Sequence, residues 1–293
     1  MSALIEVNTD GLAKLADTVG GWFGWNANAV ERMAEAEAYA TVRKVDAENA
    51  AALARLQGED QVAQYLLARE ARRMNNVQQV VEKTQSMFAE GEQVSNEPVN
   101  PDWVNRFISI VEDISDDEMQ KLWARILAGE IKQPKSYSLR TLELLRNITK
   151  DDAENIVRLA KFAISDDRLC SEEDFAMKLN DQILMDDIGM ICGEECVRTY
   201  HISERQPYSI VIDKNTIITM YVNANIDVKI KYYKMSKAGR EILKLIPFDK
   251  RDDFVANLAN HLKKQGVERI TKNNIISWDG SQYTYIPNAA VEI

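Results

Sequence analysis

The chain has 293 residues and a formal net charge of −10, with 45% apolar and 28% charged residues. This balance is typical of a folded globular protein with room for two or three domains, and it opposes a surface built wholly for nucleic acid or anionic lipid. Three cysteines form no disulfide framework. Because there is no signal peptide and no apolar run of about 18 residues, the sequence predicts a cytoplasmic protein without a membrane span.

The N-terminal segment combines a short amphipathic helix with an aromatic cluster. Asp10 is placed to cap this helix. Its apolar side carries Leu12, Leu15, Ala16, Val19, Trp22 and Phe23. Lys14 is the only cation among the first 25 residues, whereas interfacial membrane anchors are typically rich in Lys and Arg. The segment therefore favours packing against another helix or a neighbouring subunit over membrane contact.

Residues 27–92 predict a long helix because they lack proline and are rich in Ala, Glu, Gln, Arg and Leu. Between residues 49 and 88 a mostly apolar heptad predicts a seam against a partner helix, although Asp60 and Glu70 interrupt it. Two interpretations are open: the helix folds back on its own chain, or it joins copies of the chain into a homo-oligomer. The candidate self-association residues are Leu53, Leu56, Leu67, Met74, Val77, Val81 and Phe88.

A helical module follows at residues 97–165. Its second helix begins at Ser115 or Asp116 and ends at Gly129, and Thr149 caps a later helix. Trp123 is expected to be buried, and Glu130 is interpreted as a solvent-exposed charge at a helix end. The apolar faces of successive helices carry Trp103, Phe107, Ile110 and Val111, then Met119, Leu122, Trp123, Ile126 and Leu127, then Leu139, Leu142, Leu145 and Ile148.

Three runs of this module carry a family resemblance: DW at 102–103, QKLWARILAGE at 120–130 and SLRTLELL at 138–145. With them the module resembles the bacterial family catalogued as domain of unknown function 2806. That family is in turn similar here to the abortive-infection alpha proteins of phage defence. The resemblance implies a role in phage defence or prophage biology, and it implies no catalytic residue.

After residue 165 the pattern changes to short helices and strands. Ser171, with three acids behind it, predicts a helix start, and Gly189 closes a further short helix. Strands are expected at 209–212, 216–222 and 226–233, a helix at 252–265, and a hairpin at 270–286. This order resembles a winged helix with a long wing. The predicted fold class is α+β, mainly helical, with parts at 1–96, 97–165 and 166–293.

Candidate chemistry in the chain is sparse. Cys170, Cys192, Cys196 and His201 are four possible tetrahedral zinc ligands, but Cys170 is solitary and apolar neighbours favour simple packing of the cysteines. There is no phosphate-binding loop, dinucleotide fingerprint or metalloprotease motif. With two histidines in the chain, no catalytic set is apparent, so neither an enzyme nor a cofactor is predicted.

Charge is distributed unevenly along the C-terminal part. Residues 166–228 hold 5 Lys/Arg against 13 Asp/Glu, whereas residues 229–272 hold 12 against 5. The basic segment either pairs with the acidic one or contacts phosphates weakly. The candidate nucleic-acid contacts are Lys229, Lys231, Lys234, Lys237, Arg240 and Lys244.

Three functions fit these observations. The first is a non-enzymatic, self-associating interaction protein that acts with a protein partner. The second is a nucleic-acid-binding regulator, and the third is a membrane-active effector that uses the N-terminal aromatics.

Overall fold

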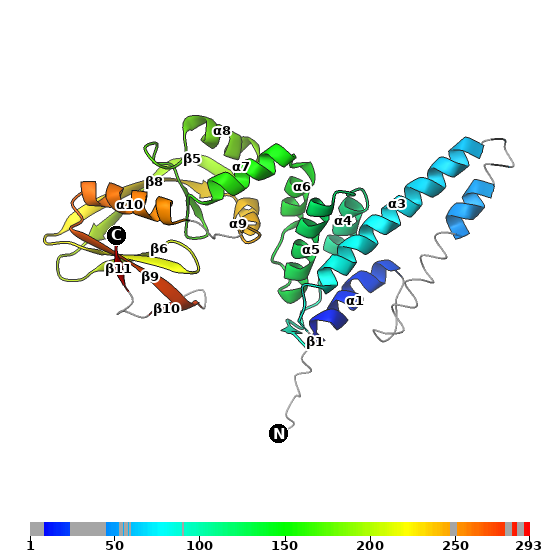
Figure 1. The fold of residues 1–293 in the computed structure, drawn as a ribbon, viewed down its shortest axis with the longest axis horizontal. Helices are drawn as coiled ribbons and strands as arrows, with labels where there is room; N and C mark the ends of the chain where they lie inside the picture. Colours follow the sequence, from blue (N-terminus) through cyan, green and yellow to red (C-terminus); the bar gives the residue numbers. More distant parts are fainter. Residues whose placement is uncertain are drawn as a thin grey trace, which may run out of the picture. The chain divides into compact units, whose positions relative to one another are not determined.

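The protein is described by a computed structural model that covers residues 9–23, 45–52, 55, 58, 60–89, 91–246, 251–278, 283–285 and 290–293. Its contacts divide the chain into two compact units, Met1–Arg146 and Asn147–Ile293. Both contain helices and antiparallel strands (Figure 1). The predicted class, α+β and mainly helical, is confirmed.

The first unit is built around helices. Strands β1 (Thr9–Asp10) and β2 (Gln93–Val94) pair in a two-stranded sheet. The helices are α1 (Gly11–Phe23), a segment at 45–52, α3 (Asp60–Gln85), α4 (Pro101–Val111), α5 (Asp117–Lys132) and α6 (Leu139–Asn147). Helix α3, cyan in Figure 1, packs most extensively against α5.

Local capping fixes where α4 and α5 begin. The side chain of Asn100 accepts hydrogen bonds from the amides of Asp102 (2.8 Å) and Trp103 (3.2 Å), and a proline occupies the first turn. Asp116 accepts from the amide of Met119 at 2.9 Å, so Asp116 is the N-cap of α5. These bonds satisfy amides that have no partner within the helix.

An aromatic cluster forms the core of this unit. The rings of Trp103 and Phe107 stack at 5.2 Å, and Phe107 meets Trp123 edge-on at 5.7 Å. The Trp103 indole also donates to the backbone carbonyl of Tyr137 at 2.8 Å. Trp123 is completely buried, which confirms its predicted place in the core.

The interpretation of Glu130 as an exposed charge is wrong. Its side chain is only 2% exposed, and its carboxylate accepts the backbone amides of Lys135 (2.6 Å) and Tyr137 (2.9 Å). Burying a carboxylate is tolerated where such charge-assisted bonds replace water. Glu130 therefore holds the loop between α5 and α6, in which Lys135 adopts a left-handed conformation (φ 70°).

The second unit holds two larger antiparallel sheets. One has the order β3-β4-β8-β5, and the other has the order β10-β9-β7-β6 with β11 also paired to β9. Its helices are α7 (Lys150–Ala160), α8 (Leu179–Asp187), α9 (Lys237–Leu243) and α10 (Asp252–Lys264).

The strands of the first of these sheets are β3 (Ala163–Ile164), β4 (Arg168–Cys170), β5 (Ile191–Ile202) and β8 (Ile226–Met235). The second consists of β6 (Tyr208–Val211), β7 (Thr216–Tyr221), β9 (Arg269–Trp278), β10 (Tyr283–Tyr285) and β11 (Val291–Glu292). The predicted strands at 209–212, 216–222 and 226–233 correspond to β6, β7 and β8. The predicted C-terminal hairpin is the β9–β10 pair.

Where β4 ends, other groups take up the backbone hydrogen bonds on that side of β8. Gln265 accepts from the amide of Lys229 (2.7 Å) and donates to its carbonyl (2.8 Å). Glu172 accepts from the amide of Lys231 (2.7 Å), whose carbonyl accepts from the amide of Ser171 (3.1 Å). The backbone at Ser171 is thus engaged by β8, and residues 173–175 form a turn. The helix start predicted at Ser171 is wrong.

The two units differ from the three predicted parts, whose boundaries lie at residues 96 and 165. Helix α3 packs against α4 and α5, so the long helix and the start of the helical module share one unit. Helix α7 falls in the second unit.

Candidate interaction surfaces

The second half of α3 is fixed to its own chain; we call residues 73–85 the packed half. The Asn76 amide donates to the carbonyl of Glu112 at 2.9 Å, and the Thr84 hydroxyl lies 3.4 Å from the carbonyl oxygen of Ala124. Val77 and Val80 are completely buried. These contacts reach both α4 and α5, so this part of α3 belongs to the core of the unit.

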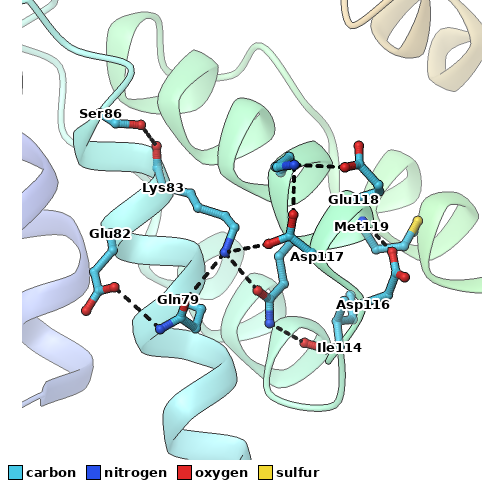
Figure 2. Close-up of polar contacts among 11 residues, drawn as sticks. Gln79, Glu82, Lys83, Ser86, Ile114, Asp116, Asp117, Glu118 and Met119 are labelled. Atoms are coloured by element: carbon cyan, nitrogen blue, oxygen red, sulfur yellow. Dashed lines mark hydrogen bonds and ion pairs between the residues drawn. The ribbon is translucent and has the colours of Figure 1, made fainter.

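A polar cluster reinforces the packed half (Figure 2). The Lys83 ammonium lies 3.2 Å from a carboxylate oxygen of Asp117 and 3.1 Å from the side-chain oxygen of Gln120. Lys121 contacts the other oxygen of Asp117 at 2.7 Å. Hydrogen bonds from Lys121 and then from Lys83 lower the pKa of Asp117 below its usual value. The start of α5 therefore carries a carboxylate held between two cations.

The predicted self-association residues fall into different environments. Val77 and Phe88 are buried inside their own unit, and Leu67, Met74 and Val81 are partly exposed. The predictions at Leu53 and Leu56 lie outside the described residues. Val77 and Phe88 are therefore held inside their own unit, whereas Leu67, Met74 and Val81, spaced seven residues apart, lie on one partly exposed side of α3.

The first half of α3 has a different exposed surface; we call residues 60–72 the open half. Val62 is 48% exposed, Tyr65 65% and Leu66 40%, although all three are large apolar side chains. With about 3.6 residues per turn, Val62 and Leu66 lie on the same side of α3 as Val80 and Thr84. The side that α4 and α5 cover along the packed half is thus exposed along the open half.

The segment at 45–52 lies beside α3 (Figure 1). Its Ala47 lines a hollow of about 240 Å³ together with Leu67 and Met74 of α3. Ala51 and Ala63 are buried, whereas the acids Asp46 and Glu48 are exposed. The segment therefore covers a side of α3 that carries Leu67 and Met74, and it leaves the Val62–Leu66 side exposed.

The apolar side of α1 packs within the first unit. Leu15 and Val19 are buried, and α1 contacts α4 and α5. The Lys14 ammonium donates to the carbonyl of Ser95 at 2.6 Å, and burial lowers the pKa of this side chain. The side chains of the GGWFGW aromatics lie outside the described residues. Where the structure describes the chain, no helix is long and apolar enough to cross a membrane.

The candidate nucleic-acid contacts of the basic segment lie on β8, on α9 and at the C-cap of α9. Five of its six candidate side chains are exposed, and Arg240 is partly exposed. Lys231 lies 3.7 Å from Glu195, and Lys237 lies 3.8 Å from the buried Glu241. Helix α8, in contrast, has three aspartates and no lysine or arginine. The cations therefore come from a strand and from α9 rather than from α8.

The four candidate zinc ligands do not converge. Cys170 is buried, Cys192 and Cys196 are exposed on β5, and the His201 ring lies 2.6 Å from Asp227 near the far end of that strand. Five residues of strand, about 17 Å, separate His201 from Cys196. In the described part of the chain no three His, Cys, Asp or Glu side chains could hold a metal ion together.

The central part of the chain has a family match. Residues 61–172 match the model of DUF2806, described as a protein of unknown function. The match supports assigning this segment, from α3 to the residues after β4, to the DUF2806 family. No curated protein and no solved structure matches the chain.

The DUF2806 match begins within the open half of α3, where the heptad pattern did not single out Val62, Tyr65 or Leu66. The heptad follows Leu67 and Met74 instead, and these two residues line the hollow beside the 45–52 segment. The spacing of Val62, Tyr65 and Leu66 at i, i+3 and i+4 was the signal that could have identified these residues as one apolar group.

Proposed function

We propose that this protein is a non-enzymatic, self-associating interaction protein, and that the open half of α3 forms the contact between its copies. Large apolar side chains at Val62, Tyr65 and Leu66 lie close together on an exposed helical surface. Such clusters mark interaction surfaces more often than isolated apolar residues do. This exposed stripe is the observation that carries the proposal.

The contact is expected to resemble a packing that α3 already makes. Along the packed half, the Val80 and Thr84 side of α3 is buried by α4 and α5. Val62 and Leu66 lie on the same side of the helix nearer its start, and a second helix would bury them in the same way. One side of α3 would therefore serve two contacts, one within the chain and one between chains.

The charges around the stripe suit a second copy of the same surface. Arg69 and Arg72 are exposed on α3, and Asp46 and Glu48 are exposed on the neighbouring 45–52 segment. In a two-fold contact, each copy presents the same patch to the other. Basic residues of one copy can then face acidic residues of its partner, which favours self-association over binding of an unrelated, uniformly charged protein.

The biological setting that we propose is phage defence or prophage biology. It rests on the resemblance of the module at 97–165 to abortive-infection alpha proteins, carried by the runs at 102–103, 120–130 and 138–145. In this setting, we propose that copies of the chain associate with one another and with a further protein partner. A cytoplasmic location is part of the same proposal.

Charge insertion into the stripe tests the self-association contact. We propose Val62→Glu with Leu66→Glu, since glutamate preserves helix propensity while two acids would enter an apolar contact. The matched control is Gln64→Glu with Ala68→Glu, which adds the same charges at the same spacing to other exposed positions of α3. Light scattering should show a dissociation constant raised about tenfold or more for the first variant alone. Equal masses for both variants and the parent would exclude this stripe as the contact.

Nucleic-acid binding is a second candidate function. The order β4-β8-β5, with α7 and α8 preceding β5, suits a winged helix with a long wing between β5 and β8. The exposed lysines of β8 and α9 favour contact with phosphates. The three aspartates of α8 oppose its entry into a major groove, so we propose only weak backbone contact. Membrane action ranks third, because Leu15 and Val19 of α1 are buried.

A further inference from the structure

The ladder between β5 and β8 contains a bulge bounded by two cysteines. Cys192 lies opposite Lys234, and Cys196 lies opposite Tyr232, with a register shift between them. Three residues of β5, 193–195, therefore lie opposite a single residue of β8, the one between Tyr232 and Lys234. Two extra residues are thus inserted on the β5 side.

The bulge brings the two cysteines close together. Their partners on β8 are two residues apart, so the cysteine Cα atoms lie about 6.4–6.8 Å apart along the ladder. Four residues of regular strand would separate them by about 13 Å. Disulfides usually join Cα atoms about 4.4–6.8 Å apart. Because Lys234 and Tyr232 lie on the same face of β8, Cys192 and Cys196 also share one face.

Both thiols are accessible and lie against the bulge. Cys192 and Cys196 are exposed, and their sulfur atoms lie 3.6 Å from the carbonyl oxygen of Lys234 and 3.5 Å from that of Glu194, respectively. Gly193 has a φ of +81°, and nothing lies within 4 Å of the position that a Cβ would occupy there. The space beside Gly193, between the two cysteines, is therefore open.

Cys170 provides an internal contrast. It lies opposite Tyr232 from the β4 side, but it is completely buried. Burial raises the pKa of the Cys170 thiol to about 12, which keeps it protonated and unreactive at neutral pH. The second unit therefore holds one protected thiol and two accessible ones.

We propose that Cys192 and Cys196 form a reversible intramolecular disulfide, a modification site that responds to disulfide oxidants such as oxidised glutathione. One thiolate attacks a sulfur of oxidised glutathione, the glutathione S–S bond breaks, and one glutathione thiolate leaves. The second cysteine thiolate then attacks the protein sulfur of this mixed disulfide. The Cys192–Cys196 bond forms and the second glutathione thiolate leaves.

The exchange balances in atoms and electrons. The protein dithiol loses two electrons and two protons, and oxidised glutathione gains them to become two glutathione thiols. The resulting bond would close the bulge at residues 193–195 and fix the start of β5 against β8. This start also anchors α9, because the Met190 carbonyl accepts from the amide of Ser236 at 3.0 Å.

The test equilibrates the full-length protein with mixtures of reduced and oxidised glutathione, quenches it with acid, and measures intact mass and linked peptides. The parent should lose two hydrogen atoms, carry no glutathione, and yield a peptide joining Cys192 to Cys196. At oxidising ratios of glutathione, Cys192→Ser and Cys196→Ser should each carry one glutathione on the remaining exposed cysteine, because no second protein thiol can displace it intramolecularly. Cys170 should stay unmodified throughout.

A relocated thiol provides the matched control. Cys196→Ser with Arg198→Cys keeps two exposed cysteines on one face, because Arg198 lies opposite Ile230, but it moves their partners on β8 to positions four residues apart. The equilibrium constant for the internal disulfide should fall by about tenfold or more, since effective concentration drops steeply when two groups cannot meet. Glutathione on both cysteines of the parent, disulfides between chains, or equal closure in the relocated variant would each overturn the proposal.

Discussion

The side-chain amide of Asn76 donates a 2.9 Å hydrogen bond to the backbone carbonyl of Glu112, the residue that caps the end of α4. Asn76 is buried, so this bond fixes the middle of α3 to the end of α4. Arg73 reinforces the same point through an ion pair of 3.4 Å to the Glu112 carboxylate. The bond lies near the start of the packed half of α3. Only the open half, residues 60–72, is therefore left to contact another chain.

Replacing Trp123 by alanine should lower the free energy of unfolding by about 3–5 kcal/mol, because a completely buried indole leaves a large cavity. Urea unfolding followed by circular dichroism measures this loss. Leu139→Ala is the control, since Leu139 lies in the same unit and is 44% exposed. Similar losses for the two variants would mean that Trp123 does not lie in the core.

Replacing Gly239 by alanine should destabilise the second unit. A Cβ at Gly239 would clash with the carbonyl oxygen of Met190, so the start of α9 would have to move away from the start of β5. Such overpacking typically costs about 1–3 kcal/mol. Thermal unfolding should show a lower midpoint for this variant, whereas Lys244→Ala at the exposed end of α9 should leave it unchanged. An unchanged midpoint for Gly239→Ala would contradict the close packing of α9 on β5.

Removing the carboxylate of Asp117 should have an effect that depends on pH. Its pKa is lowered below the usual 3.8 by hydrogen bonds from Lys121 and Lys83, so ionised Asp117 stabilises the folded state. This contribution is complete above the unfolded pKa and is lost as pH falls through the lower folded pKa. The stability difference between the parent and Asp117→Asn should therefore be present at pH 6 and shrink as the solution is acidified below the usual carboxyl pKa of 3.8. Because the pair is exposed, added salt should also reduce it. A difference that grows on acidification would contradict the cluster in Figure 2.

Nucleic-acid binding by the basic segment should be weak. We expect dissociation constants of about 10⁻⁴ to 10⁻⁶ M at physiological salt, with a steep loss of affinity as salt rises. Exchanging Lys234, Lys237, Arg240 and Lys244 for glutamate should abolish binding. Exchanging the exposed Lys150, Lys178, Arg205 and Lys214 instead provides a control with the same change of charge. Submicromolar affinity that only the first variant loses would make the nucleic-acid regulator the better function.

Local patterns in the sequence were sufficient to predict several elements. The N-cap at Asp116, the buried face around Trp123 and the strands β6, β7 and β8 depend on neighbouring residues, and all are present. Strand β5 was not predicted, although it extends over Ile191–Ile202. The bulge at residues 193–195 interrupts its alternation, and regular alternation is the main sequence signal of a strand.

Distant contacts explain the other differences. The heptad predicts that α3 is a long helix, but which half is packed depends on α4 and α5, which come later in the chain. Glu130 appeared to be a charge at a helix end because the amides that it binds, at Lys135 and Tyr137, belong to a loop whose course no local pattern specifies. The proximity of Cys192 and Cys196 likewise depends on their register with β8.

Sedimentation equilibrium of the unmodified protein over a wide concentration range tests the proposed self-association most directly. Contact through the open half of α3 predicts a molar mass that rises with concentration to at least twice the chain mass of 33.3 kDa. The Val62→Glu, Leu66→Glu variant should remain nearer the chain mass at the same concentrations. A parent protein that stays at 33.3 kDa throughout would contradict self-association through this surface.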